Sequence, residues 1–136
     1  MLKLIGDNGR IEVAVLDYLH EDAGHSEDRN WLTCRISACL GGFCFTANCA
    51  IQTYDIQHLH ELFQSQRQAF SWLLPDDDVT IEFCVEDRVL KSALLVVRQK
   101  IAAEEMSSSF AISTQIQCRE VLEEIEELMV EFPVLR

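Results

Sequence analysis

Basic side chains are scarce in this sequence, and that scarcity limits the partners the chain can bind. The 136 residues include 11 lysines and arginines against 23 aspartates and glutamates, so the formal net charge is −12. Nucleic-acid binding relies on cationic side chains that neutralise phosphates, and we therefore exclude a nucleic-acid partner. The acidity fits either a basic protein partner or a need for solubility alone, and composition leaves both explanations open.

Long hydrophobic runs are also missing. No apolar stretch approaches the ~18 residues that a membrane-spanning helix needs, and residues 1–7 lack both the apolar core and the cleavage site of a signal peptide. We expect a soluble, cytoplasmic protein without membrane contact. Because 136 residues with 49% hydrophobic side chains suffice for a single core, residues 1–136 are predicted to form one domain.

Motifs of known catalytic and metal sites are absent from the sequence. It contains no nucleotide-binding, serine-hydrolase or zinc-protease string. His58 and His60 are two positions apart, which on a helix directs their rings to nearly opposite sides. His20 and His25 lie in or beside an acidic loop and are interpreted as solvated, and residues 76–78 lack the spacing of a calcium loop. We predict no catalytic, cofactor or metal site.

The six cysteines include no CxxC pair. Four of them recur at intervals of five residues, at Cys34, Cys39, Cys44 and Cys49. Along one continuous strand an odd spacing directs neighbouring side chains to opposite faces, which argues against a metal cluster. We predict reduced cysteines that act as small apolar residues, in preference to disulfides or metal ligands.

Alternation of apolar and polar residues predicts that much of the chain forms half-buried strands. The Gly41-Gly42 pair is predicted to turn the chain between two of them, making an antiparallel hairpin. Residues 103–108 are polar and are expected to form a linker. The predicted strands cover residues 2–5, 10–18, 30–40, 43–51, 79–86, 89–101 and 110–116.

Two segments have the spacing of helices. Thr53 is placed to cap a central helix over about residues 54–68, whose apolar stripe includes Phe70 just beyond its end. A C-terminal helix is predicted over about residues 120–132, and Pro133 ends it. The order of elements predicts an α+β fold, in which a mostly antiparallel curved sheet of about six to eight strands is packed by these two helices.

The C-terminal helix carries the most one-sided charge in the sequence. Glu120, Glu123 and Glu127 lie opposite its apolar stripe, and no lysine compensates them within the predicted helix. Val130 lies on the same outer side. An ordinary solvated face and a binding face for a cationic partner both explain this pattern, and an exposed valine among carboxylates favours contact with a partner. These four residues are our candidate partner-binding residues.

A family resemblance rests on two strings. Asp28-Arg29-Asn30-Trp31-Leu32 opens a strand after an acidic loop, and Glu131-Phe132-Pro133-Val134 follows the last helix. With the strand over residues 43–51 and the helix after it, they resemble the WapI-type immunity proteins of bacterial polymorphic toxin systems. The resemblance implies a cytoplasmic protein that binds and neutralises a cognate toxin without enzymatic activity. From the residues alone, Asn30 is predicted to bond to local backbone at the start of its strand.

Two functions follow as hypotheses. The first is a non-catalytic binding protein whose partner is a protein, such as a cationic toxin domain. The alternative is a small-molecule-binding protein or cryptic enzyme with a site between the sheet and the central helix. That alternative requires a pocket of about 300 Å³ or more with converging polar groups.

Overall fold

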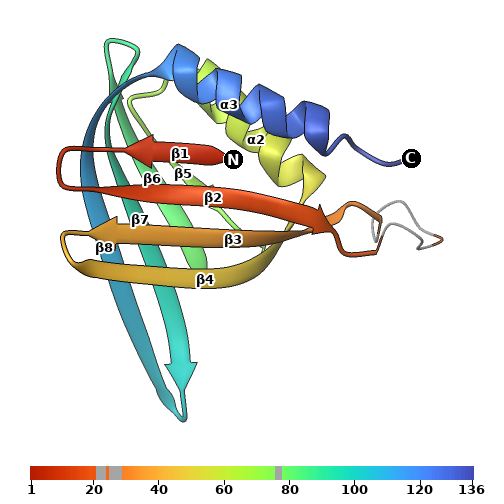
Figure 1. Cartoon of the computed structure of the whole chain (residues 1–136), viewed down its shortest axis with the longest axis horizontal. Helices are drawn as coiled ribbons and strands as arrows, with labels where there is room; N and C mark the ends of the chain where they lie inside the picture. Colours follow the sequence, from red (N-terminus) through yellow and green to blue (C-terminus); the bar gives the residue numbers. More distant parts are fainter. Residues whose placement is uncertain (21–23, 25–28, 76–77) are drawn as a thin grey trace.

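The described residues form eight strands and two helices in the order strands, helix, strands, helix (Figure 1). The computed structural model describes residues 1–20, 24, 29–75 and 78–136. Every strand pairing in it is antiparallel. These features confirm the predicted α+β fold. His25 and residues 76–77, for which a solvated loop and a turn are predicted, lie outside the described residues.

The strands form two four-stranded sheets, with orders β1-β2-β3-β4 and β5-β6-β7-β8. The inward side chains of both sheets and the apolar faces of the helices join in one buried cluster. The first sheet contains β1 (Leu2–Ile5), β2 (Gly9–Tyr18), β3 (Trp31–Leu40) and β4 (Phe43–Gln52). The second contains β5 (Ala69–Leu73), β6 (Val79–Glu86), β7 (Val89–Ile101) and β8 (Glu104–Gln117).

Two expectations for the second sheet are wrong. The predicted linker over residues 103–108 belongs mostly to β8, whose first six residues are all exposed. Backbone pairing with β7 holds this part of β8 in the sheet. Because neither of its faces is buried, the sequence there does not alternate between apolar and polar residues. In β5, Phe70 and Trp72 are buried on one face, so Phe70 belongs to a strand and not to the helical stripe.

The central helix α2 (Thr53–Gln64) is shorter than predicted and begins differently. Its N-cap is Gln52, whose backbone N–H donates to the Asp55 carboxylate at 2.6 Å, so the expected cap at Thr53 is wrong. The Thr53 hydroxyl instead donates to the side-chain oxygen of Asn30 at 3.0 Å. Just beyond the helix, Gln66 adopts a left-handed conformation with φ of 60°, which ends the helix before residue 68.

The C-terminal helix α3 (Cys118–Glu131) begins two residues before the predicted start and ends near the predicted end. It lies beside α2 at one end of the molecule, while the β7–β8 hairpin extends toward the other end (Figure 1). Among the described residues, no helix is long and apolar enough to cross a membrane.

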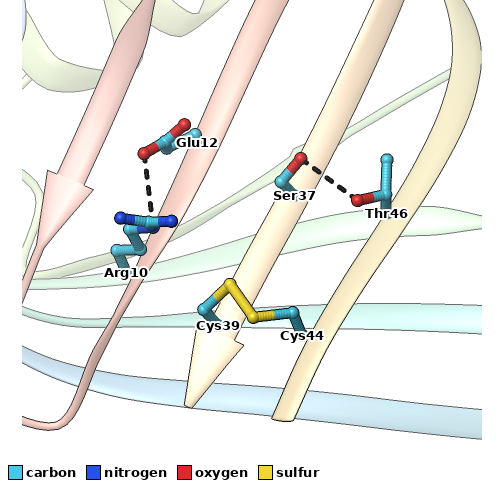
Figure 2. Close-up of a disulfide and its surroundings, with 6 residues drawn as sticks. All are labelled: Arg10, Glu12, Ser37, Cys39, Cys44 and Thr46. Atoms are coloured by element: carbon cyan, nitrogen blue, oxygen red, sulfur yellow. Dashed lines mark hydrogen bonds and ion pairs between the residues drawn. A yellow bond between two sulfur atoms is a disulfide. The ribbon is translucent and has the colours of Figure 1, made fainter. Parts of the chain in front are cut away.

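Cys39 and Cys44 form a disulfide across the β3–β4 hairpin, with their Cα atoms 4.2 Å apart (Figure 2). The prediction of reduced cysteines is therefore wrong for this pair. A two-residue turn at Gly41-Gly42 pairs residues that are equidistant from it, so Cys39 faces Cys44 and Cys34 faces Cys49. The second pair remains as thiols, and the Cys49 contact together with burial raises the pKa of the Cys34 thiol.

Candidate partner-binding site on the C-terminal helix

Packing of α3 against the core determines which of its side chains face solvent. Val121, Ile125 and Leu128 are buried, and the helix contacts α2, β1 and β8 along that side. The remaining side carries the four predicted residues. Glu120, Glu123 and Glu127 are exposed, and Val130 is 82% exposed. The structure thus brings all four onto one outward side of the helix.

The second half of this side forms a shallow depression of about 530 Å³, lined by Glu123, Glu126, Glu127, Val130 and Glu131. Glu120 lies one turn earlier and does not line it. We call these six residues the acidic face. It combines several exposed carboxylates with one exposed apolar side chain, which suits contact with a cationic protein surface.

The negative charge of the acidic face is partly compensated by an arginine that the predicted boundaries of the C-terminal helix left out. Since α3 begins at Cys118, it includes Arg119, whose guanidinium lies 3.9 Å from the Glu123 carboxylate. His60 of α2 lies 3.0 Å from Glu126. Both side chains of the Arg119–Glu123 pair are highly exposed, and exposed ion pairs contribute little to stability. Among the described residues, Glu127 has no ion pair, so a net negative charge remains.

Glu124 does not belong to the acidic face, although it lies on the same helix. Its carboxylate accepts a hydrogen bond from the backbone N–H of Lys3 at 3.3 Å, which directs it toward β1. Burial raises the pKa of Glu124, while the Lys3 N–H and nearby positive charges oppose that rise. This half-buried glutamate joins α3 to the first sheet.

The two helical histidines lie on different sides of α2, as their spacing predicts. His58 is exposed and lies 3.9 Å from Glu61, whereas His60 is mostly covered and contacts Glu126. Within the part of the chain that the structure describes, no three histidine, cysteine or acidic side chains come together as metal ligands.

A second concavity, which the sequence does not predict, lies at the opposite end of α3. We call it the helix-end pocket. It has a volume of about 600 Å³ and is formed by the end of α2, the β6–β7 turn and the first turns of α3. Its lining residues are Phe63, Gln64, Gln66, Arg88, Gln117, Cys118, Arg119 and Leu122. They come from separate segments, so no local spacing in the sequence indicates the pocket.

Comparison with known proteins gives one positive result. A model of the immunity protein WapI-like family matches residues 1–133, which include both sheets and both helices. Neither the curated proteins nor the solved structures contain a significant match.

Proposed function

Because the chain belongs to the immunity protein WapI-like family, we propose that it is a cytoplasmic, non-catalytic protein that neutralises a bacterial toxin by binding it directly. Family membership supports a protein toxin as the partner. The observation that carries the binding site is the acidic face, where exposed carboxylates with a net negative charge line a depression together with the 82%-exposed Val130.

The acidic face has the physical properties of a docking surface for a cationic domain. Exposed charges of one sign accelerate the encounter with a partner of opposite sign, and the acceleration falls as salt screens them. An apolar side chain inside the charged rim supplies contact area from which water is excluded. Because the buried side of α3 is fixed by the core, the helix that carries these groups is held in place before the partner arrives.

The first test is a double charge reversal, Glu123→Lys with Glu127→Lys, assayed against the C-terminal domain of a candidate toxin identified from the genes that adjoin this one. We expect this variant to bind that domain at least about tenfold more weakly and to lose protection of toxin-expressing cells. The matched control is Glu104→Lys with Glu105→Lys, which makes the same charge change at the β7–β8 tip, away from α3 (Figure 1). Equal weakening by both variants would refute a specific role for the acidic face.

The apolar centre of the face is tested separately by Val130→Ser. The side chain is almost fully exposed, so the unfolding free energy should stay unchanged while binding weakens. Association should also slow as sodium chloride rises. Full protection by the Val130 and charge-reversal variants would remove the acidic face from the proposal.

The alternative function, small-molecule binding or cryptic catalysis, has one observation in its favour. The helix-end pocket of about 600 Å³ exceeds the ~300 Å³ that such a site requires, and it lies at the end of the central helix. A neighbouring gene for a metabolic enzyme, with no toxin-like domain nearby, would favour this alternative over toxin neutralisation.

A further inference from the structure

The helix-end pocket continues into a smaller neighbouring depression. That depression has a volume of about 200 Å³ and shares Phe63, Gln66, Arg88 and Cys118 with the larger pocket. It adds Arg67, Gln68, Phe70, Val85 and Asp87. Together they form one concave region that extends from α3 to the α2–β5 and β6–β7 turns.

Positive charge gathers in this region although the chain carries a net charge of −12. Arg67, Arg88 and Arg119 line it from three different segments. Two carboxylates oppose them: Asp87 lines the smaller depression, and Glu123 lies 3.9 Å from Arg119. In the described part of the chain, Arg67 and Arg88 make no ion pair. The concave region therefore has a local excess of positive charge that the fold itself does not use.

The floor of the helix-end pocket is apolar. Phe63 and Cys118 are buried, and Leu122 is half-buried beside them. Burial raises the pKa of the Cys118 thiol, which keeps it neutral. Gln64, Gln66 and Gln117 contribute amide groups at the rim. A ligand with an apolar body and one anionic end matches this division between floor and rim.

Arg88 has an uncommon backbone conformation. Arg88 and Asp87 form the β6–β7 turn with φ of 63° and 52°, a left-handed conformation that glycine adopts more easily. Glycine at position 88 would therefore suit the turn at least as well as arginine does.

We propose that the helix-end pocket binds a small organic anion, with its apolar body on Phe63, Cys118 and Leu122 and its anionic group held by Arg88 and Arg119. The anionic group of the ligand is an oxyanion, either a carboxylate or a phosphate, and its body is aromatic or aliphatic. This site goes beyond toxin neutralisation and does not depend on it, since the depression in the acidic face, lined by residues 123–131, lies further along α3.

The test uses the whole chain and two fluorescent probes that share an aromatic body. 8-Anilinonaphthalene-1-sulfonate carries an anionic group, and N-phenyl-1-naphthylamine lacks it. We expect the sulfonate to bind at one saturable site, more tightly than the neutral probe and more weakly at high salt. Arg88→Gln and Arg119→Gln should each weaken it about fivefold to tenfold, the effect of losing one charge-assisted contact. Arg35→Gln, an exposed arginine on β3, should leave it unchanged.

Arg88→Gly separates binding from folding. Glycine favours the left-handed turn, so this variant should be at least as stable as the parent protein and yet bind the sulfonate weakly.

Backbone amide NMR shifts on titration should localise to residues 64–68, 87–88 and 117–122. Titrating benzoate and phenyl phosphate against the bound probe distinguishes the two oxyanions. Equal binding of both probes, an equal loss in Arg35→Gln, or amide shifts elsewhere would overturn the proposal.

Discussion

At the scale of single residues, Asn30 connects three parts of the chain that are distant in sequence. Its side-chain oxygen accepts the backbone N–H of Leu135 at 2.7 Å and the Thr53 hydroxyl at 3.0 Å. Its side-chain nitrogen donates to the Leu135 carbonyl at 2.8 Å. These bonds join the start of β3 to α2 and to the C-terminal tail. Asn30 belongs to one of the two strings that carry the family resemblance, and its role here is structural.

We predict that Asn30→Ala lowers the free energy of unfolding by about 2–3 kcal/mol. The residue is only 4% exposed, so the change removes its bonds and leaves buried partners without a replacement. Urea unfolding followed by circular dichroism measures the effect. The control Asn48→Ala, on the exposed face of β4, should change stability by less than about 0.5 kcal/mol. A loss no larger than that of the control would show that the tail is held without Asn30.

The residue pattern of α3 predicts correctly which of its side chains face outward. Helical periodicity determines which side of an amphipathic helix is buried, and the exposed positions of Glu123, Glu127 and Val130 agree with it. The contact between His60 and Glu126 joins residues 66 positions apart, so it depends on how α2 and α3 pack and not on either local pattern. Whether the acidic face binds a partner stays a prediction.

At the scale of elements, the β3–β4 hairpin shows what turn geometry adds to alternation. The sequence predicts two strands and the Gly41-Gly42 turn. A two-residue turn also fixes which residues face each other, and the structure pairs Cys39 with Cys44 accordingly. Considering the cysteines along one strand, instead of across two, misses the pairing of Cys39 with Cys44. Register across a turn is the signal that would have identified the disulfide.

We predict four accessible thiols in unreduced, denatured protein and six after reduction, from thiol titration. Reduction, or Cys39→Ser with Cys44→Ser, should lower the free energy of unfolding by no more than about 2 kcal/mol, because the closed loop is short. Backbone pairing already holds the strand ends together. Cys84→Ser, an exposed thiol on β6, is the control and should have no effect. Six thiols before reduction would contradict the disulfide.

At the scale of the whole molecule, the sequence predicts one curved sheet and the structure has two. Local alternation identifies strands but does not tell which strands pair, since pairing depends on contacts between distant segments. The two sheets meet at the β1–β2 turn. There the Asn8 side chain donates to the Ala111 carbonyl at 3.1 Å and accepts the Ser113 N–H at 3.0 Å, both from β8. The Asp7 N–H donates to the Ser113 carbonyl at 3.1 Å.

We predict that Gly6→Ala weakens this junction and destabilises both sheets together. A β-carbon at Gly6 would lie 2.2 Å from the Ser113 carbonyl oxygen, so the turn must move away from β8 at a cost of about 1–3 kcal/mol. Gly42→Ala is the control, because a β-carbon there meets nothing within 4 Å and the change should be near neutral.

Trp31 lies in the first sheet and Trp72 in the second, so single-tryptophan variants report on each sheet. We expect both tryptophans to report the same urea midpoint in the parent protein, because one core links the sheets. Gly6→Ala should move both midpoints to lower urea concentration. Separate transitions in the parent protein would show that the sheets unfold independently.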